Sequence, residues 1–338
     1  MGRRFLLLVS IVVIALQVVF ATACGGDDDD RLTIYAGRSR NLVEPLLNQF
    51  AEDTGINIQV RFGDGTDLAL AILEEGENSP ADVYYGQDVG ALGALKADGR
   101  LAELPASVLE SVDPTFRSPD GLWVGISGRQ RVMVYNAEDI DPATLPSSVL
   151  DYTDPEWRGR LGVVPRSDGF PEFVTALRLT RGDDFARQWL TDLKANDPTA
   201  FPNNISAIQA IANGEIDVAF LNHYYLFRFL EEEGEDFGAR NYYFTNGDIG
   251  GLFLVAAAGI LDSADHREDA ERFLQYMLSA DAQQYFTDET HEYPLLPGVA
   301  ADPELQPLAE IDPPEIDLSD LTDLEGSLEM MRETGILP

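Results

Sequence analysis

Thiols, imidazoles and basic side chains are scarce in this chain of 338 residues, which has one cysteine, three histidines and 23 lysines and arginines against 59 acidic residues. A single cysteine excludes an internal disulfide and a paired-cysteine zinc site. The formal net charge of −36 repels phosphate backbones, so nucleic acid is excluded as a partner. Such a charge favours solubility at high salt, or it attracts cations.

The motifs of the common catalytic centres are also missing. The chain has no GxSxG elbow, no Walker loop and no HExxH pair. His223, His266 and His291 are scattered, so a catalytic triad would rest on composition alone. The acidic run EEEGED is most simply the solvated end of a helix. We therefore expect that the protein is not an enzyme.

One long hydrophobic run is present, at the N-terminus. The segment MGRRFLLLVSIVVIALQVVFATAC has two arginines, an apolar stretch and small residues before Cys24, which is typical of an export signal. It resembles the bacterial lipoprotein signal, so we expect removal of residues 1–23 and lipidation of Cys24. An uncleaved membrane anchor is the alternative. Cleavage removes two arginines and no acid, which makes the charge −38, and residues 24–31 then form a solvated tether.

Strand and helix patterns alternate after this tether. Strand-like segments and amphipathic helices form a β-α-β-α-β series at 31–37, 41–55, 56–62, 66–78 and 81–86. This order predicts a mostly parallel sheet with helices on both faces, and hence the α/β class. A second α/β unit is predicted from about Val132, and 266–286 is predicted to be one long helix. The length suggests two domains or lobes.

Polar clusters follow four of the predicted strands. They are GRSRN at 37–41, GQD at 86–88, PRSDG at 165–169 and NHYY at 222–225. Ligands of open α/β sheets bind outside the carboxyl ends of the strands, and helix N-termini there offer N–H groups to anions. Because two clusters come from each half of the chain, we expect them to face one another across a cleft.

Tyrosines occur as adjacent pairs at 84–85, 224–225 and 242–243. The first and third pairs lie in strand-like runs, where neighbouring side chains point to opposite faces. Tyr224 and Tyr225 instead begin a helix beyond a strand, where both phenols can approach one point. Packing is the commoner role of such a pair. A trivalent cation favours the phenolate, however, and Fe(III) prefers hard oxygen ligands.

Seven segments resemble the ferric-iron-binding proteins of bacterial ABC importers, sometimes called bacterial transferrins. They are LTIYAGRSRN, FAEDTGINIQV, PADVYYGQD, ISGRQRVMVYN, SVLDYTDPEWRGRLGVVPRS, NNISAIQAIANGEIDVAFLNHYY and EYPLLPGV, in family order over nearly the whole mature chain. The resemblance implies a two-lobed periplasmic-binding-protein (venus flytrap) fold that closes by a hinge. It also implies Fe(III) in the cleft, held by two consecutive tyrosines and a synergistic anion, carbonate or phosphate.

The metal ligands that the resemblance implies are Tyr224 and Tyr225. Many members add a histidine and a glutamate at positions that are here Ser39 and Gln87, and neither of these is a good anionic ligand. Some members also carry a tyrosine in the region of PRSDGF, where this chain has none. Asp88 is either a replacement carboxylate or a helix N-cap. We expect these three non-tyrosine side chains to line the cleft.

The anion-binding residues that the resemblance implies come from three loops: Ser167, Asp168, Gly169, Asn204 and Asn222. Arg38 and Arg129 lie at positions where a guanidinium group approaches the cleft. Arginine suits bidentate recognition of oxyanions. An ordinary surface or interlobe ion pair is the alternative role of both arginines.

The combined prediction is a lipid-anchored receptor at the extracytoplasmic face of the cell membrane, monomeric, that delivers Fe(III) to an ABC permease and its ATPase. Its lobes would interleave, the N-terminal lobe comprising 32–128 plus 254–307 and the C-terminal lobe 129–253 plus 308–338. The alternative is a solute-binding protein for a small organic or oxyanion solute, such as a phosphonate, a polyamine or a thiamine-like compound.

Overall fold

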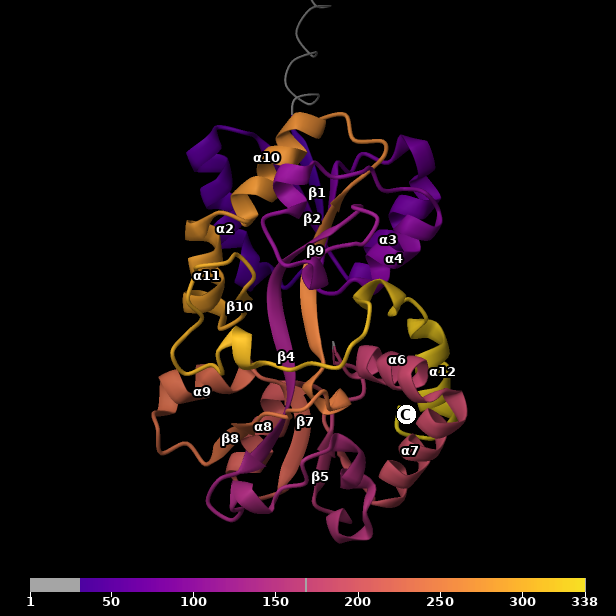
Figure 1. Ribbon diagram of the computed structural model, residues 1–338, viewed down its shortest axis with the longest axis vertical. Helices are drawn as coiled ribbons and strands as arrows, with labels where there is room; N and C mark the ends of the chain where they lie inside the picture. Colours follow the sequence, from indigo (N-terminus) through magenta and orange to yellow (C-terminus); the bar gives the residue numbers. More distant parts are fainter. Residues whose placement is uncertain (1–30, 168, 338) are drawn as a thin grey trace, which may run out of the picture.

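A computed structural model describes residues 31–167 and 169–337 of the chain. The predicted signal peptide, Cys24, the tether except Arg31, and Asp168 therefore lie outside the described residues. Two lobes follow one another along the long axis of the molecule (Figure 1). In the part of the chain that is described, no helix is long and apolar enough to cross a membrane.

The first lobe is built from the expected alternation of strands and helices. Its elements are β1 (Leu32–Gly37), α2 (Arg40–Thr54), β2 (Ile58–Phe62), α3 (Gly65–Glu75), β3 (Val83–Gly86), α4 (Gly90–Ala97) and the short α5 (Ala106–Leu109). β1 pairs in parallel with β2 on one side and β3 on the other. Helical spacing buries one face of α2 in the core through Val43, Leu46, Leu47 and Phe50.

The second lobe repeats this architecture with a different connectivity. Its elements are β5 (Leu161–Val163), α6 (Phe170–Arg181), α7 (Asp183–Ala195), β6 (Thr199–Ala200), α8 (Asn204–Ala212), β7 (Val218–Asn222), α9 (Tyr225–Glu233) and β8 (Ala239–Tyr242). β5 pairs in parallel with β6 and β7. A smaller hydrophobic cluster of this lobe forms where α8 packs on β7 and includes Ile208, Ile211 and Leu221.

Two strands connect the lobes. The sheet has the order β2-β1-β3-β9-β4-β7-β5-β6, with β4 (Val124–Asn136) and β9 (Phe253–Ile260) at its centre. β4 runs from one lobe into the other (Figure 1) and pairs with β9 up to Gln130 and with β7 from Arg131 on. Both pairings are antiparallel. The prediction of a mostly parallel sheet is therefore right within each lobe and wrong at the centre, because β4 and β9 run between the lobes in opposite directions.

The C-terminal third returns to both lobes. It contains α10 (Arg267–Met277), α11 (Ala280–Thr290), β10 (Tyr293–Pro294) and α12 (Leu324–Glu333). The predicted single helix over 266–286 is wrong, because the Ser279 side chain caps a new helix by accepting a hydrogen bond from the Ala282 N–H. α12 packs on α6 of the second lobe. The α/β class and the two-lobed architecture are confirmed, whereas the lobe boundaries given above stay a prediction.

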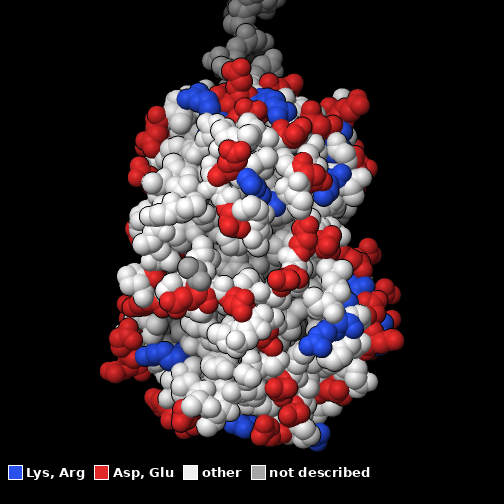
Figure 2. Space-filling model, in the orientation of Figure 1, with Lys and Arg blue, Asp and Glu red and all other residues white. Residues whose placement is uncertain are grey.

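Acidic side chains are distributed in patches over the visible face of both lobes, and the few lysines and arginines are scattered among them (Figure 2). The surface therefore carries the negative charge that the composition predicts. Among the buried arginines, three are almost completely buried where the lobes meet: Arg38, Arg129 and Arg131.

Candidate metal and anion site

Tyr224 and Tyr225 lie where β7 ends and α9 begins. Their ring centroids are 4.3 Å apart and their planes are inclined by 32°, so the two phenols project side by side. Tyr224 is only 6% exposed. Burial raises the pKa of Tyr224 well above its usual value, and the nearby phenol of Tyr225 raises it further, while Arg129 acts in the opposite direction. Without a cation, this phenol therefore keeps its proton.

Two arginines of β4 face this tyrosine pair. Nη1 of Arg131 donates to Asn222 Oδ1 at 2.9 Å, and its Nη2 donates to the Phe220 carbonyl at 2.6 Å. Arg129 donates through Nη1 to the main-chain carbonyl of Gln87. Nε and Nη2 of Arg129 and Nε of Arg131 are buried without a hydrogen-bond partner among the described residues. These donors are available for an anion, and an unpartnered buried donor is costly unless one is bound.

Arg131 was missed by the sequence reasoning, although a simple signal marks it. It follows Arg129 by two residues in one strand, so both side chains leave the same face of β4. Burial lowers the pKa of Arg131 to about 9, and Arg129 acts in the same direction, whereas Glu172 and the two phenols oppose them. The guanidinium group therefore remains charged at neutral pH.

Arg38 forms a buried ion pair that the sequence did not predict. Nη1 and Nη2 of Arg38 donate to the two carboxylate oxygens of Glu292 at 3.1 and 2.7 Å. Burial alone would lower the pKa of Arg38, but the carboxylate outweighs it and raises that pKa. Burial alone would raise the pKa of Glu292, but the guanidinium group of Arg38 outweighs it and lowers that pKa. Ser127 and Thr290 also donate to this carboxylate, so Arg38 is held in a buried ion pair, which differs from the surface or interlobe pair considered above.

The loops after β1 and β3 bring Ser39, Gln87 and Asp88 to one cavity of about 770 Å³ between the lobes, which Arg38 and Ser167 also line. Oε1 of Gln87 accepts a hydrogen bond from Arg38. Oδ1 of Asp88 accepts from the Gly90 N–H at 2.9 Å in an Asx turn just before α4, whose N-cap residue is Val89 and not the expected Asp88. The described residues contain no cluster of three His, Cys, Asp or Glu side chains that could hold a metal ion.

Gly169 and Asn222 meet at the second-lobe side of the cleft. Gly169 has φ +99, and a Cβ atom there would lie 2.9 Å from Asn222 Oδ1 and 3.1 Å from Arg131 Nη1. Its N–H donates to Glu172 Oε2 at 2.7 Å, within the first turn of α6. Only a residue without Cβ allows the loop to approach this closely. Ser167 donates through Oγ to the Val164 carbonyl.

Asn204 is the first residue of α8 and is 3% exposed. Its Oδ1 has no hydrogen-bond partner within the part of the chain that is described. The structure thus brings Asn222, Gly169 and Arg129 toward the tyrosine pair, whereas no contact links Asn204 to them.

His223 has a structural role between the lobes. Its Nδ1 accepts the Gln130 N–H at 3.1 Å, so Nε2 carries the proton and donates to the His291 carbonyl at 2.8 Å. Burial lowers the pKa of His223 to about 4, which keeps the ring neutral at pH 7. The imidazole next to the tyrosine pair is therefore occupied by two main-chain groups.

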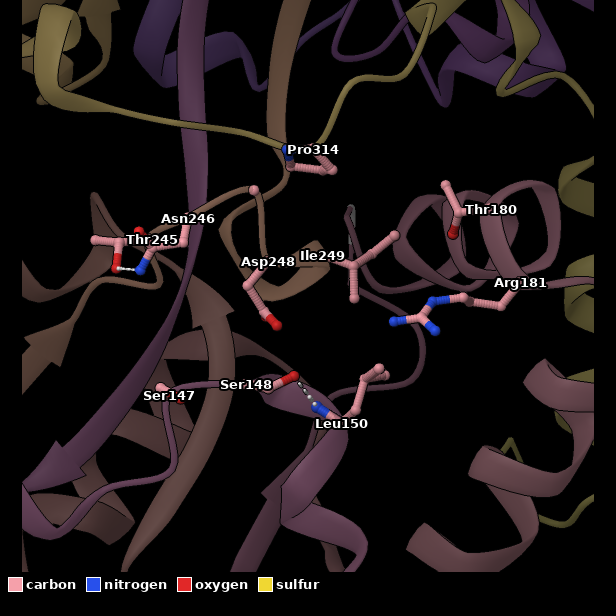
Figure 3. A pocket seen from close by; sticks show the side chains of 11 residues that line it. Ser147, Ser148, Leu150, Thr180, Arg181, Thr245, Asn246, Asp248, Ile249 and Pro314 are labelled. Carbon is pink, nitrogen blue, oxygen red and sulfur yellow. Dashed lines mark hydrogen bonds between the residues drawn. The ribbon is translucent and has the colours of Figure 1, made fainter.

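A second cavity, of about 350 Å³, lies in the second lobe and contains none of the predicted site residues. Asp248 and Ser148 point into the space between the labelled side chains (Figure 3). Asp248 Oδ1 already accepts the N–H groups of Val149 and Gly250, and Ser148 Oγ accepts that of Leu150. These polar atoms of Asp248 and Ser148 therefore stabilise local turns.

Several known proteins are similar to this chain in sequence and in overall fold. A major ferric iron-binding protein of Neisseria meningitidis serogroup A is 33% identical over 310 residues, covering 90% of this chain and 93% of that protein. Iron-bound HitA from Pseudomonas aeruginosa has a TM-score of 0.84 at 39% identity, covering 90% and 99% of the two chains. Trichodesmium FutA in complex with iron and citrate has a TM-score of 0.79 at 26% identity, covering 90% and 99%.

The family model described as bacterial extracellular solute-binding protein matches residues 78–315. This match covers more than half of the chain, and the relatives above extend it to nearly all of the described residues. The resemblance stated from the sequence is thereby confirmed. The chain belongs to the bacterial extracellular solute-binding protein family.

Proposed function

We propose that this protein is the extracytoplasmic receptor of an ABC importer, which binds Fe(III) between its lobes and delivers it to a membrane permease driven by a cytoplasmic ATPase. The names of the relatives support iron as the cargo. The observation that carries the proposal is the pair of adjacent phenols beside buried, partly unpartnered guanidinium groups. An organic solute without a metal would leave this pair of phenols without a role.

The chemistry of binding follows from the burial of the phenols. Tyr224 and Tyr225 lose their protons as they ligate Fe(III), because the charge of the ion outweighs the cost of a buried phenolate. An anion completes the coordination and neutralises Arg129 and Arg131. Its further contacts are the loop of Ser167 and Gly169 with Asn222. Carbonate and phosphate are the first candidate anions, and the citrate in the Trichodesmium relative supports an organic acid as a third.

The setting of the receptor is part of the proposal. Lipidation of Cys24 anchors it to the membrane, the tether over 24–31 spaces it from the lipid, and the monomer acts without catalysing a reaction. The lobes comprise 32–128 with 254–307 and 129–253 with 308–338. Closure about β4 and β9 then buries the ion.

An absorbance titration of residues 25–338 with ferric citrate tests the cargo. We expect a broad visible phenolate-to-iron band that saturates near one iron per chain and disappears in the Tyr224→Phe, Tyr225→Phe double variant. The matched control is Tyr242→Phe with Tyr243→Phe, which removes an adjacent pair from the end of β8. Absence of the band with citrate, carbonate and phosphate alike would overturn the proposal.

A further inference from the structure

One residue of the first lobe, His291, contacts one side of α9 in the second lobe. Its main-chain carbonyl accepts a hydrogen bond from Nε2 of His223 at 2.8 Å. Its ring stacks on that of Phe227, with centroids 5.2 Å apart and planes inclined by 27°. Its Nε2 lies 3.4 Å from Glu231 Oε1. Because the three contacted residues are spaced by four, they follow one side of the helix from its N-terminal end.

The other ring nitrogen of His291 faces a second carboxylate. Its Nδ1 lies 3.1 Å from Asp302 Oδ2, and the Asp302 N–H donates to Thr287 Oγ1 at 2.6 Å, which ties this residue to α11. A neutral imidazole has one N–H group and can donate to only one of the two carboxylates, whereas the imidazolium form donates to both. Only the protonated ring therefore bridges Asp302 and Glu231 of the second lobe.

The backbone of His291 has an uncommon conformation. This residue ends α11 with φ +52, in the left-handed region that a residue with a Cβ atom rarely adopts. Such conformations persist where the surrounding contacts hold them. His291 is 5% exposed, whereas the Glu231 side chain is 63% exposed. The bridge therefore has the strength of a partly exposed ion pair.

The contacts of His291 span the point where β4 changes its partners. β10, which follows His291 in the chain, pairs with β4 at Gly128. β7, which precedes α9, pairs with β4 from Arg131 on. In Figure 1, α9 lies on the same side of the molecule as α11 and β10. A rotation of one lobe against the other about this part of β4 moves α9 relative to His291, so the bridge resists it.

Four further titratable groups lie near the bridge, and they keep their charge between about pH 5.5 and pH 8. Burial lowers the pKa of His223 to about 4, so this ring stays neutral. Burial raises the pKa of Tyr243 to about 12 and also raises that of Tyr293. Burial would raise the pKa of Glu292, but its guanidinium partner lowers it. His291 is therefore the group of this cluster whose charge changes over that range.

We propose that His291 is a pH-responsive latch between the lobes, whose imidazolium form binds both Glu231 and Asp302 and holds α9 against the first lobe. Because α9 begins with Tyr225, the latch also fixes the position of the tyrosine pair relative to that lobe. Loss of the proton frees one of the two carboxylates and loosens α9. The latch does not depend on the cargo, so its failure would leave the proposed function standing.

Single-molecule energy transfer in the iron-free protein tests the latch. Residues 25–338 contain no cysteine, so dyes can be attached to Glu52→Cys on α2 and Gln188→Cys on α7, which are exposed positions of the two lobes. Relative to all others, molecules with the interlobe distance of this structure should become about threefold fewer between pH 5.5 and pH 8, as expected for a partly exposed ion pair. A distance distribution that is independent of pH would overturn the latch.

Variants separate the latch from a general effect of pH. Glu231→Gln removes one of the two carboxylates at an exposed position, and His291→Gln removes the titrating ring, so both should lose most of the pH dependence. Glu232→Gln, an exposed neighbour on α9, is the matched control of equal charge and should keep it. His266→Gln, which removes the histidine beside Asp82, should also keep it. The parental pH dependence in Glu231→Gln would overturn the proposal, even if His291→Gln does not fold.

Discussion

The two sides of the cleft are built on opposite principles. On the second-lobe side, Tyr224 and Tyr225 are adjacent, and three guanidinium nitrogens of Arg129 and Arg131 have no hydrogen-bond partner among the described residues. On the first-lobe side, Arg38 is already neutralised by Glu292, and Gln87 is held by two guanidinium groups. The second-lobe side therefore has several unpartnered donors, whereas on the first-lobe side the two terminal nitrogens of Arg38 are satisfied by the protein and Nε of Arg38 lacks a partner among the described residues. Substitutions on the second-lobe side should therefore weaken ligand binding, and substitutions on the first-lobe side should lower the stability of the fold.

The largest effect is expected from Tyr224→Phe. Losing one of the phenolate ligands should weaken iron binding by at least about a thousandfold, which corresponds to about 4 kcal/mol. Equilibrium competition with a chelator of known affinity measures it, and the unfolding midpoint should barely change because the ring is retained. Iron binding within tenfold of the parent would show that Tyr224 is only a packing residue.

Arg38→Met should destabilise the fold rather than merely weaken binding. It leaves the buried Glu292 carboxylate without its guanidinium, which typically costs about 3–5 kcal/mol. Urea unfolding of the protein without iron measures the loss. Arg40→Met removes the exposed pair with Glu44 and should cost less than about 1 kcal/mol. Similar costs for the two variants would contradict the distinction between the sides.

Acid should destabilise the protein through His223. Its pKa of about 4 in the fold lies below the usual value near 6.5, so the unfolded chain binds one more proton between these values. The contribution of the neutral His223 ring to the free energy of unfolding is complete above pH 6.5. It should fall by about 1.4 kcal/mol per pH unit as the pH is lowered to about 4. Urea unfolding across this range measures the slope. His223→Gln should reduce it by that amount, and an unchanged slope would assign the acid sensitivity elsewhere.

The smallest effect is expected from Gly169→Ala. Besides the strain of φ +99, the added methyl group meets Asn222 Oδ1 and Arg131 Nη1, so we expect a loss of about 2 kcal/mol together with weaker iron binding. Gly55→Ala has φ +70 and no atom within 4 Å, so only strain of about 1 kcal/mol applies. Thermal unfolding and iron titration are measured on both variants. The extra loss in Gly169→Ala relative to Gly55→Ala then gives the effect of the close contacts, as distinct from that of backbone strain.

The parts that the sequence predicted are those set by local pattern. Alternating strands and helices give the parallel half-sheets, and the position of Tyr224 and Tyr225 between a strand and a helix distinguishes them from the other tyrosine pairs. The antiparallel centre could not be predicted, because β4 reads as one continuous buried strand whichever partners it has. Ser279 interrupts an otherwise helical pattern only through its side-chain cap.

The parts of the site that were missed depend on contacts between distant residues. Arg38 and Glu292 are 254 residues apart, so their pairing left no local signal. Arg131 could have been found from its spacing to Arg129. Gln87 was noted as a poor ligand, but its hydrogen bonds to two arginines, which reach it from elsewhere in the fold, left no local signal.

The change of partners along β4 has a mechanical consequence. Arg129 lies where the strand still pairs with β9, and Arg131 lies where it pairs with β7. Any rotation of one lobe against the other must twist the backbone between these two residues, and so change the spacing of their guanidinium groups. If the two guanidinium groups hold an anion as proposed, opening would separate the donors that hold it, so that a permease that separates the lobes would release the cargo without any chemical change to the ion.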